Sequence, residues 1–316
     1  MKGLFVRREE RLKADGRASA KNVGMPWAII AIAIIVATVL VVLAFCESGM
    51  IKSGNAELAD GTLRMYTIDV GHGDSILLIS PNGKTMLIDA GDKNAYPTIS
   101  GMLSELGVHK LDVIVSTHAH KDHIGSMKRI IEEYGTDMLY INSASSDSDT
   151  YTDLMSTVTR LQVDTEFAWS GDVIPWDRDC NIVVLAPVKS FDYSEGDLNE
   201  QSMILRVEYH NNAILLMGDA LKLSEEIAMQ NSEPALFKAD VLKVGHHGAS
   251  SSTSDELIKA ANPSYAVISI GREDGHKDVT ERLSKYGVTV YRTDKVGTIL
   301  AVLDGNTVEV YPYTNK

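Results

Sequence analysis

The chain has 316 residues, of which 44% are hydrophobic and 23% are charged, and this globular composition excludes a largely disordered protein. Its formal net charge of −13 argues against a domain that holds nucleic acid through a basic surface of its own. Two cysteines, Cys46 and Cys180, are too few for a disulfide framework or a cysteine-rich zinc module.

The N-terminal part of the chain predicts a membrane anchor. Residues 1–25 are rich in basic side chains, and residues 26–46 form an uncharged apolar run. As a helix rising about 1.5 Å per residue, this run spans the roughly 30 Å hydrocarbon core of a bilayer. The basic flank predicts a cytoplasmic N-terminus. We therefore expect a single-pass helix in the lipid bilayer of the cell membrane and an extracytoplasmic domain after it.

Two other interpretations of this segment are a cleaved signal peptide and a lipoprotein acylated at Cys46. Against the first, the apolar run is longer than usual and no small-x-small site follows. Against the second, Phe45 is bulky where lipoprotein processing usually requires a small residue. Residues 47–61 are small and polar and predict a linker. The remaining residues, 62–316, show no second composition break and predict one domain.

Short apolar runs bounded by turn residues predict about thirteen strands in this domain. Three turn sequences indicate hairpins, at residues 81–83, 210–212 and 304–306. Apolar residues at spacings of three and four predict helices over residues 97–106, 122–134, 151–161, 220–229, 253–261 and 278–286. The mixture predicts an α/β fold with helices outside two packed sheets.

A cluster of metal-ligating side chains follows the predicted strand 113–116, in the sequence THAHKDHIG. On an extended chain His118 and His120 share a face, whereas Asp122 and His123 enter a helical turn and point elsewhere. One loop thus offers ligand pairs to two adjacent ions, and imidazole and carboxylate suit Zn²⁺, Mn²⁺ or Fe²⁺. Chance clustering of histidines is the alternative, but active sites of α/β folds follow strands, which favours metal binding.

Two further strand ends carry candidate ligands. Asp219 follows the predicted strand 213–217, where it bridges two cations about 3.5–4 Å apart or caps the next helix. Beside the histidine cluster we favour the bridging ligand. His246 and His247 follow the predicted strand 241–244, and adjacent side chains project in different directions. We assign His246 to metal and His247 to substrate or proton transfer.

Three segments, at residues 117–125, 218–219 and 246–248, resemble in this order the metal motifs of the metallo-β-lactamase fold superfamily. Further segments resemble the hydrolase domain of the ComEC competence (DNA-uptake) family, namely residues 69–75, 87–91, 242–244 and 292–294 with Gly297. The resemblance covers about residues 62–312. It implies a four-layer αβ/βα sandwich with a dinuclear site at one edge, preceded here by the transmembrane helix.

The resemblance also implies roles for individual residues. His118 and His120 hold one ion, Asp122, His123 and His246 hold the other, and Asp219 bridges them. The residues implied to support these ligands from behind are Asp74, Asp89, Asn199 and Ser202. The residues implied to act in catalysis are Asp122, His247 and His276, the last in a Gly-His segment ahead of the final helix.

The sequence departs from the family pattern in three places, one of which is Lys277, where the family often has Pro after the Gly-His segment. His72 stands where relatives commonly have Gln. Many superfamily members have another metal-binding histidine between the first motif and the Gly-Asp segment, but that interval holds only His210, which we expect to be exposed in a hairpin turn.

These observations predict a metal-dependent hydrolase with one or two Zn²⁺ ions, Mn²⁺ being a second candidate, that acts through a metal-activated hydroxide. Two adjacent cations favour a phosphodiester substrate, and the resemblance implies a competence-related nuclease or phosphodiesterase with DNA as a partner, without a basic binding surface. One alternative is an acyl hydrolase of lactones, thioesters or β-lactams. The other is a non-catalytic, membrane-tethered binding protein.

Overall fold

The structure describes most of the predicted domain. The computed structural model describes residues 58–193, 197–272 and 278–314, and Ser53–Lys316 cluster as one compact unit. The predicted membrane helix over residues 26–46 and the candidate catalytic His276 lie outside the described residues. Among the helices of the described ranges, none is both long and apolar enough to cross a bilayer.

The first of two sheets brings together the N-terminal half of the domain and its last strands. In the described ranges it has eight strands, in the order β14 (Val308–Pro312), β13 (Ile299–Leu303), β1 (Leu63–Thr67), β2 (Ile76–Ile79), β3 (Thr85–Ile88), β4 (Leu111–Ser116), β5 (Thr136–Ile141) and β6 (Thr165–Phe167). Strands β3 to β6 are parallel, and the others pair antiparallel. Leu63 of β1 lies opposite Leu303 of β13, so this sheet joins distant parts of the chain.

The second sheet is formed by the intervening segment. Its six strands in the described ranges have the order β12 (Thr289–Arg292), β11 (Tyr265–Ile268), β10 (Val241–Lys243), β9 (Asn212–Leu216), β8 (Ile204–Tyr209) and β7 (Cys180–Ala186). Strands β9 to β12 are parallel, whereas β7, β8 and β9 are antiparallel. All three predicted hairpins are confirmed, because β2 pairs with β3, β8 with β9 and β13 with β14. His210 is exposed in its hairpin, as expected.

The helices agree with the predicted segments, with one break. They are α2 (Tyr96–Glu105), α3 (Lys121–Ile124), α4 (Met127–Tyr134), α5 (Asp149–Leu161), α6 (Lys222–Asn231), α7 (Asp255–Ala261), α8 (Asp278–Lys285) and α9 (Thr293–Val296). The helix predicted over residues 122–134 is two helices, with the break at Gly125 and Ser126. A Cβ at Gly125 would stand within 2.6 Å of the backbone of Asp92 and Lys93, so this position requires glycine. Strand β6 and helix α9 were not predicted.

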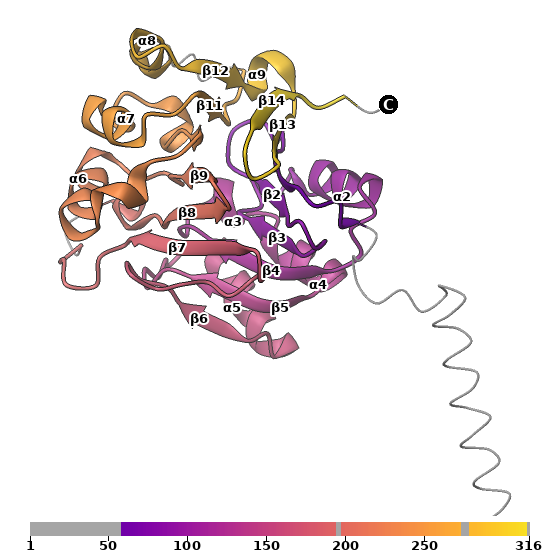
Figure 1. Cartoon of the computed structure of the whole chain (residues 1–316). Coiled ribbons are helices and arrows are strands. Elements are labelled where there is room, and N and C mark those ends of the chain that lie inside the picture. Colours follow the sequence, from indigo (N-terminus) through magenta and orange to yellow (C-terminus); the bar gives the residue numbers. More distant parts are fainter. Residues whose placement is uncertain (1–57, 194–196, 273–277, 315–316) are drawn as a thin grey trace, which may run out of the picture. The chain divides into compact units, whose positions relative to one another are not determined.

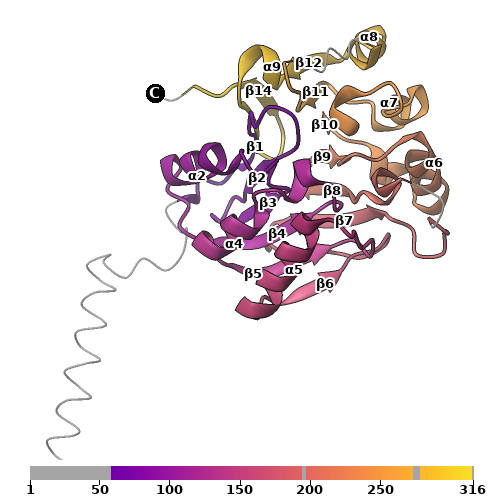
Figure 2. The ribbon, with the colours of Figure 1, turned by 180° about the vertical axis from the view of Figure 1, so that it is seen from behind.

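Three apolar clusters hold the layers together. The side chains of β4 alternate between them: Val113 and Val115 pack in the cluster between the two sheets, and Ile114 packs against the helices outside. Helices α2 to α5 cover the first sheet, and α6 to α8 cover the second. Figure 1 shows α6, α7 and α8 on one side and α2 on the other, and Figure 2 shows α4 and α5 in front of the first sheet. The layer order is therefore helix, sheet, sheet, helix.

The carboxyl ends of four parallel strands meet at one edge of this sandwich. In the first sheet these strands are β3 and β4, and in the second they are β9 and β10. A backbone hydrogen bond of 3.0 Å from the N–H of Met203 to the carbonyl of Thr117 joins the two halves here. Loops that follow these strands therefore lie side by side, although they are far apart in the sequence.

Candidate metal centre

Four loops at this edge carry the imidazole and carboxylate side chains. Asp89 follows β3, the segment from His118 to His123 follows β4, Asp219 follows β9, and His247 follows β10. Asp89 and His247 adopt left-handed backbone conformations, with φ of 58° and 52°. Such conformations are uncommon outside glycine and concentrate at functional sites, where surrounding contacts hold them. Here they turn the backbone sharply after β3 and after β10.

Asp219 lies at the centre of the cluster. Its Oδ2 is 3.1 Å from Nε2 of His123, 3.3 Å from Nε2 of His247 and 3.8 Å from Nε2 of His118. With Asp122, whose Oδ2 is 3.5 Å from Nε2 of His247, one ligand atom each of Asp122, His123, Asp219 and His247 fall within 4.8 Å of one another. Helix α6 begins at Lys222 with Leu221 as its N-cap, so Asp219 does not cap it.

His118 and His120 form a second pair beside this cluster. Nε2 of His118 is 3.1 Å from Nδ1 of His120, and their rings are 4.7 Å apart. This proximity agrees with the expectation that the two side chains share a face of an extended segment. His118 is fully buried, whereas about a third of the His120 side chain is exposed. His118 is therefore the inner member of the pair, next to Oδ2 of Asp219, and His120 is the outer member.

Hydrogen bonds determine which nitrogen of each ring faces the cluster. Asp89 Oδ2 accepts the hydroxyl of Thr117 at 2.6 Å and lies 2.7 Å from Nδ1 of His123. Because the Thr117 hydroxyl has given its one hydrogen to Asp89, it accepts from Nδ1 of His118 at 3.1 Å. Nδ1 of His247 donates to the carbonyl of Ser269 at 3.2 Å. All three Nδ1 atoms carry protons, which leaves Nε2 of each ring to a cation.

Burial and charge act in opposite directions on these groups. Burial lowers the pKa of His118 well below its usual value. Burial also lowers the pKa of His123, but the carboxylates of Asp219 and Asp89 raise it well above the usual value. The same holds for His247, mainly through Asp219. Although burial raises the pKa of Asp219, His123 and His247 hold it well below the usual value. Positive charge is thus favoured at the centre of the cluster, whether protons or a metal ion supply it.

The chemistry of the donor set fits a divalent cation. Three buried side-chain atoms at the centre of the cluster have no hydrogen-bond partner: Nε2 of His123, Nε2 of His247 and Oδ1 of Asp219. Buried polar atoms are rarely left in this state unless an ion or another group satisfies them. Imidazole nitrogen and carboxylate oxygen are the ligands that Zn²⁺ and Mn²⁺ take in such sites.

The two adjacent histidines lie differently from their predicted assignment. His247 is buried in the cluster, whereas His246, which we expected to bind the ion, is half-buried beside it. Nε2 of His246 is 3.5 Å from Nδ2 of Asn199, and its Nδ1 is 3.4 Å from the hydroxyl of Ser251. Both histidines have positive φ, and this backbone turn sends the His247 ring inward and separates the two ring centroids by 6.1 Å.

The expected supporting residues lie close to the ligands. Asp89 holds His123, and Asp74 Oδ1 is 3.5 Å from Nδ1 of His247. Asn199, in the short 3₁₀ helix η2 (Leu198–Gln201), contacts His246, and the hydroxyl of Ser202 accepts from the N–H of Asp219 at 3.2 Å.

Sequence reasoning left two residues of this site without a role. His72 contacts Asp122, with Nε2 3.2 Å from Oδ2, at the exposed mouth of the cluster. Lys243 is fully buried, and its Nζ is 2.7 Å from Oδ2 of Asp74. A charged residue within an otherwise apolar strand is a signal that could have identified Lys243, because a buried charge requires a partner.

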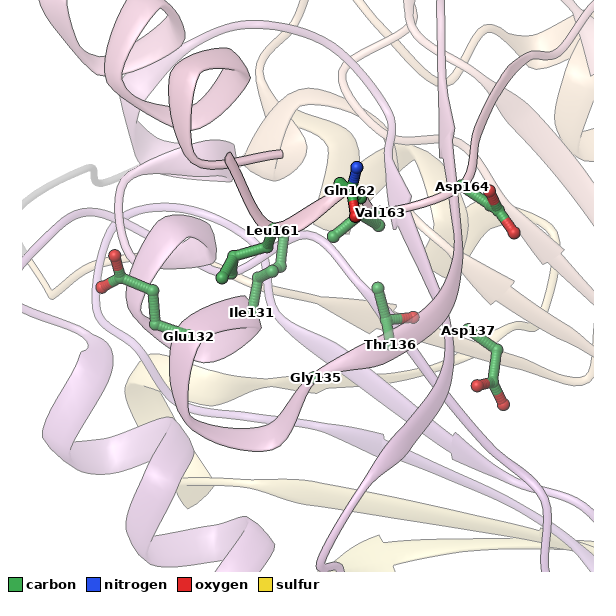
Figure 3. A pocket seen from close by; sticks show the side chains of 9 residues that line it. All are labelled: Ile131, Glu132, Gly135, Thr136, Asp137, Leu161, Gln162, Val163 and Asp164. Atoms are coloured by element: carbon green, nitrogen blue, oxygen red, sulfur yellow. The ribbon is translucent and has the colours of Figure 1, made fainter. Parts of the chain in front are cut away.

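A cavity elsewhere in the domain is separate from the cluster. It has a volume of about 470 Å³ and is shown in Figure 3. Its lining includes Thr136 and Asp137, where β5 begins, and Asp164, just before β6. Because these strands run parallel to β4, the cavity lies at the sheet edge opposite the metal-ligating loops. It contains none of the candidate ligands.

Comparison with known proteins identifies the family. The Metallo-beta-lactamase superfamily matches residues 68–272. ComE operon protein 3 of Bacillus subtilis is 30% identical over 253 residues, which cover 73% of this chain and 32% of that protein. Competence protein ComA of Neisseria gonorrhoeae is 27% identical over 236 residues, which cover 73% of this chain and 31% of that protein. The chain thus spans about a third of the length of these curated relatives.

Among solved structures, Igni18, a metallo hydrolase of Ignicoccus hospitalis, is 17% identical and aligns with a TM-score of 0.48 over 80% of this chain and 100% of that chain. The predicted resemblance to the superfamily and to competence proteins is confirmed by the family match and the curated relatives. Since the family match covers more than half of the sequence, the chain belongs to the metallo-β-lactamase superfamily.

Proposed function

We propose that the protein is a membrane-anchored phosphodiesterase of the nuclease type, related to competence, that uses two Zn²⁺ or Mn²⁺ ions. The observation that carries this proposal is the position of Asp219, whose Oδ2 lies 3.1 Å from His123 and 3.8 Å from His118. One carboxylate between two imidazole groups suits two adjacent cations. A phosphodiester needs its attacking and leaving oxygens neutralised together, and such a pair of cations provides this.

The side chains have distinct tasks in this proposal. When bound, divalent cations supply a hydroxide nucleophile near neutral pH and neutralise phosphate charge. Asp89 keeps the proton on Nδ1 of His123 and so directs Nε2 into the site. Asp122, whose side chain is 16% exposed at the mouth, would hold an ion with one carboxylate oxygen and orient the attacking water by accepting a hydrogen bond from it. His72, which contacts Asp122, orients its carboxylate.

We further propose that the roles of the two adjacent histidines are exchanged relative to the prediction from the sequence. His247 binds the ion with Asp122, His123 and Asp219, because its Nε2 is buried among them. His246, with Asn199 and Ser251 beside its ring, contacts the substrate at the rim. A catalytic role for His276 remains part of the proposal.

The proposed substrate and location rest on the relatives and on the N-terminal sequence. Relatives named as competence proteins support DNA as the phosphodiester. The basic residues 1–25 and the apolar residues 26–46 support a single-pass anchor with the domain outside the cytoplasm. Since the chain is acidic, contact with DNA at the site depends mainly on the bound cations rather than on basic side chains.

A substrate panel tests the reaction class. The full chain with Zn²⁺ or Mn²⁺ is assayed on bis-p-nitrophenyl phosphate and on single-stranded and duplex DNA, in parallel with a lactone, a thioester and a β-lactam. We expect turnover of the phosphodiesters and its loss in H123A. H210A, which removes an exposed hairpin histidine, is the matched control and keeps wild-type turnover. Turnover confined to the acyl substrates would refute the phosphodiester assignment.

A separate measurement tests the location. We expect the full chain in the membrane fraction of cells, with the domain digested by protease added to spheroplasts. Recovery of the full chain in the soluble fraction, or protection of the domain from the added protease, contradicts the proposed anchor or its orientation.

A further inference from the structure

A buried lysine lies directly behind the proposed metal centre. Lys243 is the last residue of β10, in which all three residues are buried between β9 and β11. Its Nζ donates to Oδ2 of Asp74 at 2.7 Å and to the carbonyl of Val244 at 2.9 Å. A lysine is almost never fully buried unless it is paired, and this pair joins residues 169 positions apart. It links β10 of the second sheet to a loop of the first.

The partner carboxylate contacts both halves of the site. Asp74 lies between β1 and β2, and its N–H donates to the carbonyl of Asp122 at 3.2 Å. Its Oδ1 is 3.5 Å from Nδ1 of His247. Asp74 thus touches the backbone of one proposed ligand and the ring of another, while Lys243 fixes the orientation of its carboxylate.

We propose that Lys243 and Asp74 are positioning residues, which set the distance between Asp122 and His247 and are required for tight ion binding at the cluster that these two form with His123 and Asp219. This inference rests on the metal centre of the proposed function but not on its substrate. Partners that orient metal ligands from behind typically contribute 10- to 100-fold to metal affinity. Lys243 acts through Asp74 and contacts none of the four proposed ligands of the cluster by a hydrogen bond of its own.

The competing explanation is that this ion pair only stabilises the fold. Replacing both partners of a buried pair by apolar residues of similar volume is often neutral or stabilising, whereas removing one partner leaves an unpaired charge. The variant D74L/K243M therefore separates the two explanations, because it removes the pair without leaving a buried charge. A second variant, D74N/K243Q, replaces both charged groups by neutral polar groups of similar size and likewise leaves no buried charge.

The experiment uses the metal-free full chain titrated with Co²⁺ and monitored by visible absorption, with near-UV circular dichroism as the test of folding. We expect wild type to bind two Co²⁺ ions. In D74L/K243M and D74N/K243Q, we expect one of the two ions to bind at least tenfold more weakly, with the near-UV spectrum unchanged. K84M, which breaks the exposed pair of Lys84 with Asp112, is the matched control and binds both ions as wild type does.

Two results in the variants overturn the proposal. One is wild-type Co²⁺ affinity in either variant that retains the near-UV spectrum. The other is loss of that spectrum in both variants, which assigns the pair to fold stability alone. Because the titration involves no substrate, a wild type that binds Co²⁺ but hydrolyses no phosphodiester contradicts the proposed function and leaves this inference standing. A wild type that binds no Co²⁺ contradicts the metal centre and this inference together.

Discussion

At the scale of single residues, the backbone turn at His246 and His247 decides which ring enters the site. We predict that H247A loses one of the two metal ions and nearly all turnover, because it removes a buried Nε2 next to Asp219. H246A keeps both ions, because the His246 ring lies outside the ligand cluster. Its kcat/KM falls because KM rises. Metal analysis with steady-state kinetics distinguishes them, and loss of a metal ion from H246A reverses the assignment.

The thiol of Cys180 provides a prediction of pH dependence. Burial, with Asp177 and Asp179 nearby, raises its pKa to about 12 from an ordinary value of 9.0. Since the thiolate is the reactive form, a raised pKa keeps the neutral thiol dominant until the pH approaches 12. In a C46S background at pH 8, we expect alkylation by iodoacetamide roughly 1000-fold slower in the folded than in the unfolded chain. A rate that levels off near pH 9 in the folded protein contradicts this.

The predictability of the site also differs from residue to residue. His118, His120, Asp122 and His123 are recognisable because they are close together in the sequence after one strand. The order of His246 and His247 depends on two successive positive φ values, which no residue pattern reports. The pairing of Lys243 depends on a contact across 169 positions, which one sequence cannot locate.

At the scale of elements, the loop before β2 contacts the first turn of α3, which carries Asp122. A Cβ at Gly73 would stand 2.2 Å from the carbonyl oxygen of Asp122, and the φ of Gly73 is +115°. We predict that G73A destabilises the fold by more than about 1 kcal/mol and weakens metal binding, because Asp122 must move. G71A is the control: its φ is also positive, at +76°, but no atom lies within 4 Å of the new Cβ.

Urea denaturation and Co²⁺ titration measure both effects of these glycine substitutions. Equal losses of stability and of metal affinity in G73A and G71A would show that the contact with Asp122 has no influence on the site.

Helices and strands were predicted correctly where apolar residues recur at a regular spacing. They were missed where contacts between distant parts of the chain determine the local structure. Strand β6, with the sequence Thr-Glu-Phe, is exposed at the sheet edge and has no apolar alternation to reveal it. The break between α3 and α4 falls at Gly125, which lies against the backbone of Asp92 and Lys93, a tertiary contact that helical spacing does not encode.

At the scale of the whole molecule, the proposed ligands come from both sheets, so ions bound by them would join the two halves of the domain. An ion that binds the folded but not the unfolded chain adds about 4 kcal/mol of stability at a thousand times its Kd. For a domain of this size, we predict that EDTA lowers the melting temperature by roughly 10 °C. Readdition of Zn²⁺ restores it, and H123A shows a much smaller shift. An unchanged melting temperature in wild type argues against structural coupling of the ions to the fold.

The pairing of β1 with β13 sets a condition on when this enzyme becomes active. Leu63 pairs with Leu303 only after the ribosome has synthesised every strand that lies between them in the sequence, and the loops of β3 and β4 meet Asp219 and His247 only once the second sheet has formed. Contacts of such long range form slowly. The nascent chain therefore carries the histidine motif for much of its synthesis without Asp219 beside it, and the proposed metal centre is complete only when folding is complete.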